Sequence, residues 1–453
     1  MELTLKSNQI FIESVHFLRL IRFSLRKSTL LVQWAGYLPL YFTPDHHLYF
    51  PRCGFPTINL LCQLLSGLVC YTFCWLNSSH HDEFAEKNWS SAEKFAYGVM
   101  INTLILSHML NKLISFLLRH KFIKFYHNFS SVMAEICSAF GNYQFVNHNQ
   151  NQDQILESVR KKLAKNENHI KYIGICLVLF QLGMFIMMGN LLMTMVTKSG
   201  GHNLLDIVVF IGATIFCHGL SVYHSVLIYW FVSIGKCIGV GFTLLEIFGE
   251  GSSDLMSSVV EDRQNFEKVP ANNNDSKLPM LQNDEILMNV SNFVNLYRKL
   301  GSVVKDFNST FKINLAVILF ASCLFWILHF FVFISTVIKK GLDLGSVVAG
   351  GWTVLDVISI VLICDVSSVI FEKANSALMN VSCKSLSLDP QHDLHNFIKI
   401  DASLKQLRKI PVLISPGNYF QLRRNTSISV FAIMTTYVFV ALQFHHAEYR
   451  QPK

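Results

Sequence analysis

The chain has 453 residues, of which 51% are hydrophobic, 13% aromatic and only 15% charged. So many apolar side chains with so few charges exclude an ordinary soluble protein, which needs a charged surface. The net charge of +8 could indicate an anionic partner, but the basic residues are gathered in particular segments. We therefore expect no nucleic-acid partner and use the positions of the basic residues to orient the chain in a membrane.

Residues 1–54 are predicted to form a cytoplasmic N-terminal region. Within it, residues 15–34 place Arg19, Arg22 and Arg26 on one helical face and apolar side chains on the rest. The pattern predicts an amphipathic helix lying on membrane lipid at the inner leaflet. A short buried helix with one solvated face has the same pattern and stays an alternative.

Stretches of about 20 mainly apolar residues predict transmembrane helices, and the chain contains seven of them. The fold class predicted from them is an all-α membrane protein with seven transmembrane helices. The stretches cover residues 55–77, 94–118, 170–196, 204–234, 312–338, 346–371 and 427–444.

Basic residues between these stretches are distributed unevenly. The segment before the first stretch and the segments after the second, fourth and sixth stretches together carry 29 Lys and Arg residues. The remaining segments, on the other side of the membrane, carry 6. Because Lys and Arg stay preferentially in the cytoplasm, the N-terminus is predicted to be cytoplasmic and the C-terminus extracellular. This orientation is the reverse of that of G-protein-coupled receptors.

The segments between the helices differ in character. The predicted outer loop 78–93 carries several carboxylates, Glu93 among them, and the predicted inner segments are longer and polar.

These predictions divide the chain into seven regions. They are a cytoplasmic region 1–54, helices one to four in 55–234 with a polar intracellular loop 119–169, an intracellular loop and helical extension 235–311, helices five and six in 312–371, a cytoplasmic helical anchor region 372–426, the last helix 427–444 and an extracellular tail 445–453.

Cofactor and metal sites are not expected. Most of the 11 cysteines fall in or beside predicted helices, so we interpret them as buried thiols. The glycines at 235, 239 and 241 resemble a nucleotide-binding run only superficially, because no strand precedes them. Polar groups within the membrane are too sparse to nominate an enzyme's catalytic centre.

The last apolar stretch ends in a specific pattern. Thr436 and Tyr437 are followed by five apolar residues and then by Gln443 and Phe444. This pattern resembles the C-terminal signature of insect gustatory receptors, which are related to insect odorant receptors. The resemblance implies a ligand-gated cation channel in the plasma membrane of chemosensory neurons. It also implies a homotetramer, or a heteromer with other receptor subunits, whose seventh helices surround a central pore passing cations.

The residues of the last helix suit that role. Thr436, Val440 and Gln443 share one helical stripe with Ser429 and Ile433. In one interpretation, Gln443 bonds a neighbouring helix or reaches the lipid headgroups. In the other, favoured by the resemblance, Gln443 rings the pore and Phe444 supplies an apolar constriction.

The resemblance also implies that a small-molecule tastant binds among the outer halves of helices two to six. Amides, a carboxylate and flat aromatic rings suit a sugar or polyol, whereas a bitter compound would favour aromatic rings with one anion. Asp356 is the sharpest candidate, with a packing ion pair as the alternative, because a membrane carboxylate is usually functional. We expect Asp365 to support structure or gating. The candidate ligand-binding residues are Asn102, Asn190, His218, Trp326, His329, Trp352, Thr353 and Asp356.

Two further functions stay open at the level of sequence. A secondary transporter usually shows inverted repeats and helices broken at mid-membrane, and neither is evident here. A seven-helix receptor that signals through a partner protein would require the opposite placement of the termini. The leading prediction is therefore a tastant-gated, nonselective cation channel.

Overall fold

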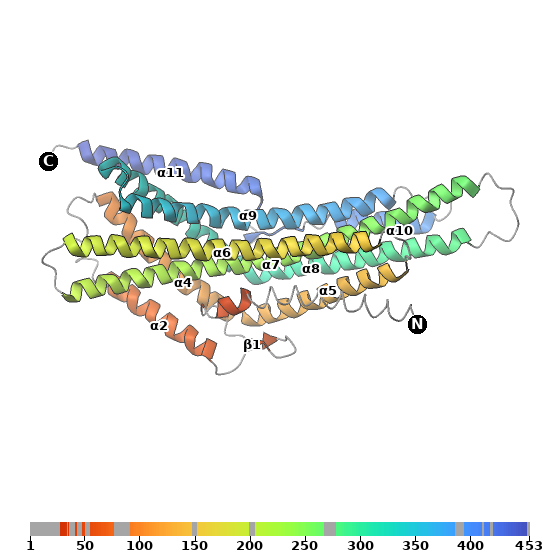
Figure 1. Cartoon of the computed structure of the whole chain (residues 1–453), viewed down its shortest axis with the longest axis horizontal. Helices are drawn as coiled ribbons and strands as arrows, with labels where there is room; N and C mark the ends of the chain where they lie inside the picture. The colour runs from red at the N-terminus through yellow and green to blue at the C-terminus, as the bar shows by residue number, and fades with distance from the viewer. Residues whose placement is uncertain are drawn as a thin grey trace.

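A computed structural model shows an elongated, almost wholly helical bundle (Figure 1), which confirms the all-α prediction. The structure describes residues 28–33, 35, 41–42, 48–49, 55–76, 91–146, 152–198, 204–266, 278–385, 394–409, 412–416 and 420–450. The arginine face predicted within 15–34 lies outside these residues, apart from a helical stretch at 28–33. A small antiparallel pair, β1 (Tyr41–Phe42) and β2 (Leu48–Tyr49), adds the strands that the sequence had not predicted.

All seven predicted apolar stretches fall on helices. The helices are α2 (Phe55–Leu76), α4 (Ser91–Leu117), α5 (Arg119–Val146), α6 (Gln152–Lys198), α7 (Leu204–Phe266), α8 (Leu278–Lys340), α9 (Leu344–Ser385), α10 (Leu394–Arg408) and α11 (Arg424–Arg450). Among the described residues, six helices are long and apolar enough to cross a membrane, and α2 contributes a shorter apolar segment, Ile58–Val69.

The helices reach well beyond a membrane. α7 and α8 contain 63 residues each, which at 1.5 Å per residue is roughly 95 Å, about three times the thickness of a bilayer's hydrocarbon core. The start of α4, the end of α8 and the end of α11 contact one another. This end is called the outer end below, after the predicted orientation, and the opposite end the inner end.

The predicted polar loop 119–169 and the predicted loop and helical extension 235–311 are both more helical than expected. α5 and the beginning of α6 lie within residues 119–169, and α7 continues to Phe266 within residues 235–311, where α8 begins at Leu278. These segments are polar in overall composition, but their apolar residues follow an amphipathic helical pattern. In α5, Phe122, Phe125 and Phe129 recur at helical spacing and are all buried.

A large aromatic cluster of the core lies between α5, α7 and α8. There Phe311 of α8 meets Phe122 of α5 and Trp230 of α7, and the ring centroids of Phe122 and Trp230 are 5.0 Å apart. Phe307 of α8 meets Phe125 of α5. The most apolar stretch of α7 is 94% buried in the bundle, whereas the corresponding stretches of α6 and α11 are only 17% buried. The central helix is therefore α7, and α6 and α11 lie at the periphery.

The glycines of α7 allow this close packing. A β-carbon at Gly235 would stand 2.2 Å from Cγ1 of Val366 on α9, and one at Gly241 would stand 3.0 Å from Leu300 on α8. At Gly239 the nearest atom would be 3.7 Å away, an ordinary contact. Gly235 and Gly241 therefore serve the packing of α7 against its neighbours.

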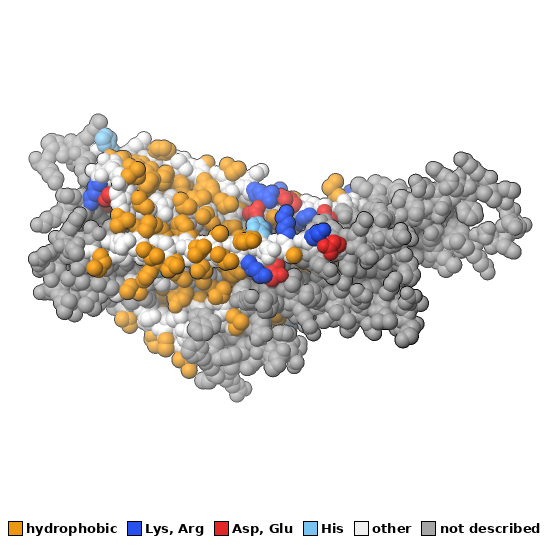
Figure 2. All heavy atoms as spheres, viewed as in Figure 1, with side chains coloured by type: hydrophobic (Ala, Val, Ile, Leu, Met, Phe, Trp, Pro, Cys, Tyr) orange, Lys and Arg blue, Asp and Glu red, His pale blue; other side chains and the backbone are white. Residues whose placement is uncertain are grey.

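One face of the molecule shows how a membrane would surround it. Apolar side chains cover the outer half and give way, toward the middle, to a group of Lys, Arg, Asp and Glu side chains (Figure 2). Exposed apolar residues on this part of α6 include Ile175, Val178, Leu182 and Ile186. The pattern is that of a lipid-facing belt ending at a charged interface.

α8 and α9 pack against each other, and α10 packs against both. Leu404 and Leu407 of α10 are buried, whereas Ile398, which follows the same predicted pattern, is 56% exposed. α10 and α11 lie at opposite ends of the bundle in Figure 1.

Candidate functional site

Two of the predicted ligand-binding residues form a polar pair between α8 and α9. Nδ1 of His329 lies 2.7 Å from Oδ2 of Asp356. Asp356 is buried and His329 is partly buried, so the surrounding protein screens the pair weakly. The pair satisfies a carboxylate that would otherwise be costly inside a membrane.

Aromatic rings extend this pair toward α7 and α6. Trp352 of α9 stacks on His329, with ring centroids 6.1 Å apart and planes 20° from parallel. The ring of His218 on α7 approaches Trp352 at 5.7 Å and Phe185 of α6 at 5.2 Å. The structure thus brings together four predicted residues: His218, His329, Trp352 and Asp356.

Gln181 of α6 adds a hydrogen-bonding group one helical turn from Phe185. Its Nε2 donates to Oγ of Ser225 on α7 at 2.8 Å. Gln181 and His218 are both buried, yet Oε1 of Gln181 and Nδ1 of His218 have no hydrogen-bond partner among the described residues. A buried polar atom without a partner is unfavourable, so both atoms are available to a ligand.

We call Gln181, Phe185, His218, His329, Trp352 and Asp356 the outer cluster. Gln181 lies in the third predicted helix, but helical periodicity alone does not show that it lies near His218 on another helix. The sequence feature that could have indicated this site is the spacing of Gln181 and Phe185, which lie four residues apart on one face of α6.

The other predicted ligand-binding residues lie outside this cluster. The hydroxyl of Thr353 donates to the carbonyl of Ala349 in its own helix at 2.9 Å. Trp326 stacks on Phe330 and faces Phe431 of α11, with ring centroids 5.0 Å and 5.9 Å away. Asn190 is exposed and Asn102 is partly exposed.

The predicted pore residues lie on the exposed side of α11. Met434, Val438 and His445 face the bundle and are buried. The opposite side carries the predicted stripe, and each member is exposed: Ser429, Ile433, Thr436, Val440 and Gln443. Tyr437 and Phe444 are also exposed, with 61% and 73% of their surfaces accessible in the single chain.

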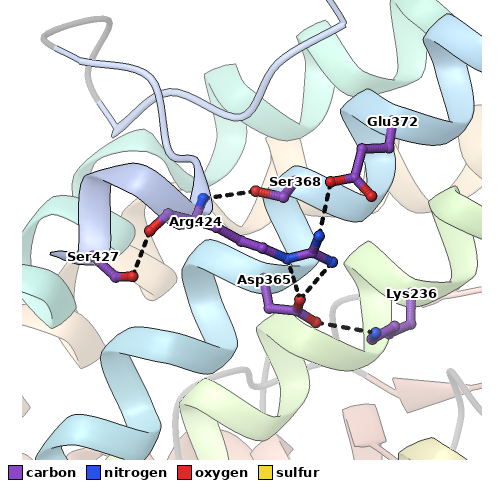
Figure 3. A network of polar contacts seen from close by, with 6 residues as sticks. All are labelled: Lys236, Asp365, Ser368, Glu372, Arg424 and Ser427. Atoms are coloured by element: carbon purple, nitrogen blue, oxygen red, sulfur yellow. Dashed lines mark hydrogen bonds and ion pairs between the residues drawn. The ribbon is translucent and has the colours of Figure 1, made fainter.

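A network of ion pairs and hydrogen bonds connects the inner end of α11 to α9 and α7 (Figure 3). The guanidinium of Arg424 contacts Asp365 at 3.0 Å and Glu372 at 2.9 Å. Asp365 also lies 3.6 Å from Nζ of Lys236, and the backbone N–H of Arg424 donates to Ser368 at 2.8 Å. Asp365 therefore joins three helices, in keeping with the structural or gating role expected of it.

Among the described residues, no group of three or more His, Cys, Asp or Glu side chains could hold a metal ion. Six of the cysteines whose side chains the structure describes are free thiols: Cys62, Cys137, Cys176, Cys237, Cys323 and Cys364.

Comparison with known proteins places this geometry in a family. Residues 30–448 match the family model described as 7tm chemosensory receptor. The fold is similar to two structures of the olfactory receptor OR5 from the insect Machilis hrabei. The complex with eugenol has a TM-score of 0.63 and 13% identity, and the structure without it has 0.57 and 14%. Each alignment covers 95% of this chain and 100% of the other. No curated protein matches the chain. The match across nearly its whole length shows that the chain belongs to the 7tm chemosensory receptor family.

Proposed function

We propose that this chain is a gustatory receptor that acts as a tastant-gated, nonselective cation channel in the plasma membrane of chemosensory neurons. A ligand binds at the outer cluster and opens a pore lined by α11. The N-terminus is cytoplasmic and the C-terminus extracellular. A homotetramer places four copies of α11 around the pore, and a heteromer with other receptor subunits is the alternative assembly.

The exposed stripe of α11 is the observation that carries the proposal. Gln443 is exposed at the outer end of a helix otherwise suited to the membrane. An amide facing lipid is unfavourable, so the stripe requires water or another chain. Phe444, the next residue, supplies an apolar surface able to close a pore by excluding water.

The stripe also indicates the selectivity. It contains hydroxyl, amide and apolar side chains, and no carboxylate. Without fixed negative charge on the lining, discrimination among cations is weak. The described part of the bundle also supports a channel over a transporter, because α6 to α9 run as continuous helices without a break at mid-membrane.

The outer cluster supports a small-molecule ligand. Oε1 of Gln181 accepts a hydrogen bond from a ligand hydroxyl, and the rings of Trp352 and His218 offer flat surface. These groups suit a sugar, a polyol or a bitter compound with hydroxyl groups. The similar olfactory receptor that was solved with eugenol supports a small organic ligand.

Whole-cell current in a heterologous cell tests the proposal, with G-protein signalling blocked and separate panels of sugars, polyols and bitter compounds. We expect an agonist-evoked cation current whose reversal potential or open-pore blockade changes in Gln443→Ala. Phe439→Ala is the matched control, because Phe439 is 61% exposed on the same helix but outside the stripe.

Two results count against the proposal. An agonist current indifferent to Gln443 and Phe444 substitutions rejects the pore lining. A response that disappears when G-protein signalling is blocked rejects the channel in favour of a receptor acting through a partner. Co-expression with other receptor subunits separates a missing subunit from a wrong mechanism when this chain alone gives no current.

A further inference from the structure

The amide of Gln181 is held at one end and open to a ligand at the other. Gln181 lies on α6, and its Nε2 donates to Oγ of Ser225 on α7 at 2.8 Å. Both side chains are less than a tenth exposed. An amide has donors at its nitrogen and an acceptor at its oxygen, so this bond determines which end is left. The atom left without a partner among the described residues is the acceptor, Oε1.

A buried acceptor selects ligands by the hydrogen atoms that they donate. A hydroxyl group donates to Oε1 of Gln181, whereas an ether oxygen has no hydrogen and leaves Oε1 unpartnered in the complex. An unpartnered buried atom retains its cost of desolvation, so such a site disfavours an analogue that lacks the donor. The open end of Gln181 therefore favours alcohols over ethers of the same shape.

His218 of α7 offers a second polar atom. Its Nδ1 has no hydrogen-bond partner in the described part of the chain. A neutral imidazole carries its hydrogen on one nitrogen, so Nδ1 donates or accepts according to the tautomer. A hydroxyl group does both and therefore suits either tautomer. His218 adds affinity for a hydroxyl group, while Gln181 determines the preference over an ether.

The body of the ligand meets aromatic rings. The ring centroid of His218 lies 5.2 Å from that of Phe185 on α6 and 5.7 Å from that of Trp352 on α9. Phe185 is also 45% exposed, on a helix whose exposed residues are largely apolar. At Phe185 the outer cluster therefore reaches the apolar surface seen in Figure 2. Flat apolar molecules bury well against such rings and dissolve in lipid, whereas sugars do not enter lipid.

We propose that the ligand is a flat, mainly apolar alcohol or phenol, and that Gln181 selects it over the corresponding ether. Gln181 contacts the ligand hydroxyl, and Ser225 is the positioning residue that holds the amide. The inference rests on the proposed function in one respect, since it takes the outer cluster as the ligand site. It does not depend on which helix lines the pore, so a binding measurement tests it separately from channel activity.

Two isomeric probes test the preference. Hydrocinnamyl alcohol and phenethyl methyl ether contain the same atoms and one aromatic ring, but only the alcohol donates a hydrogen bond. The measurement is the melting temperature of the purified full chain in detergent at increasing probe concentration. We expect the same rise in melting temperature to need about tenfold less of the alcohol than of the ether. Glucose should produce no rise at these concentrations.

Three results with the unmodified protein overturn the inference. One is stabilisation by the ether that equals or exceeds that by the alcohol. The second is stabilisation by glucose alone, which would indicate a sugar site. The third is the absence of stabilisation by either isomer.

Two variants assign the preference to its residues. Gln181→Met removes the acceptor and keeps the size of the side chain, so the alcohol and the ether should become equally effective. Ser225→Ala leaves the acceptor but allows the amide to turn, so the preference should shrink. Thr353→Val is the control and should keep the full preference, because that hydroxyl bonds its own helix.

A merely structural role of these residues predicts a different result. The variants would then melt at a lower temperature without probe, but the ratio between alcohol and ether would not change. A preference that persists in Gln181→Met rejects Gln181 as the selecting residue. One that persists undiminished in Ser225→Ala rejects Ser225 as the residue that positions it.

Current recordings with the same isomers distinguish failure of this inference from failure of the proposed function. A current that depends on Gln443 but responds equally to the alcohol and the ether overturns the inference and leaves the proposed channel intact. A current indifferent to Gln443 that still prefers the alcohol, and loses this preference in Gln181→Met, rejects the pore lining and supports the inference.

Discussion

Oδ2 of Asp356 on α9 lies 2.7 Å from Nδ1 of His329 on α8, and the ring of Trp352 stacks on the same histidine. The carboxylate is thus already engaged before any ligand binds. Its role in the proposed site is to fix the orientation of the imidazole that Trp352 covers, and this fixes the shape offered to a ligand.

Replacing Asp356 by Asn tests that relationship. The amide keeps the size of the side chain but loses a charge-assisted hydrogen bond, so we expect the half-maximal agonist concentration to rise by about tenfold. Thr353→Val is the matched control, because that hydroxyl bonds its own helix and should not affect ligand response. Dose–response curves at equal surface expression measure both. An unchanged value for Asp356→Asn would show that the pair serves packing alone.

The packing of α7 on α9 gives a second prediction. Gly235→Ala forces a methyl group to within 2.2 Å of Val366, whereas Gly239→Ala makes only an ordinary contact. We expect Gly235→Ala to lower the stability by about 1–3 kcal/mol and Gly239→Ala to change it little. Thermal unfolding in detergent measures the difference. Combining Gly235→Ala with Val366→Ala should restore stability, and failure of this rescue would reject the steric cause.

The network at the inner end of α11 predicts unequal roles for two carboxylates. Asp365 contacts both Arg424 and the buried Lys236, while Glu372 contacts Arg424 and is 55% exposed. Asp365→Ala leaves a buried ammonium without its carboxylate, so we expect a loss of about 1–3 kcal/mol. Glu372→Ala removes only a solvated ion pair, for which less than about 1 kcal/mol is expected. Thermal unfolding that ranks Glu372→Ala as the more damaging change would contradict this account.

Cys137 of α5 provides a chemical test of the inner core. Burial raises the pKa of its thiol to about 12. At about pH 8, roughly one thiol in ten thousand is then ionised, so maleimide should label Cys137 only after denaturation. Introducing a cysteine at the exposed neighbour, as Ser138→Cys in a Cys137→Ala background, should give rapid labelling. Rapid labelling of Cys137 in the folded protein would show that α5 is not packed as described.

Several features of the fold could be predicted from the sequence because they depend on local composition. The positions of the apolar helices follow from runs of apolar residues, and all of them proved helical. The stripe of Thr436, Val440 and Gln443 follows from helical periodicity, and its members are exposed together. The extent of α5 and α7 was missed, because long amphipathic helices with polar faces resemble loops in composition.

The candidate site was predicted less completely. Four of the eight proposed ligand-binding residues meet in the outer cluster, while Thr353 and Trp326 bond or stack elsewhere. Helical periodicity assigns a residue to a face of its own helix but does not identify the helix opposite. The polar cluster of Glu93, Ser335 and His445 was likewise missed, since it joins residues 242 positions apart.

The sequence by itself determined the membrane class, the positions of the apolar helical stretches and the motif of the last helix, since each depends on side chains within a few turns of one another. Only the tertiary structure decided which polar groups share a buried environment. Glu93, which the sequence placed in the outer loop, is buried in the structure and accepts a hydrogen bond from Ser335. Asp365 of α9 forms ion pairs with residues of two other helices. The physical reason is that a buried polar group must find its partner on whichever helix packs against it, and that neighbour is set by the fold as a whole.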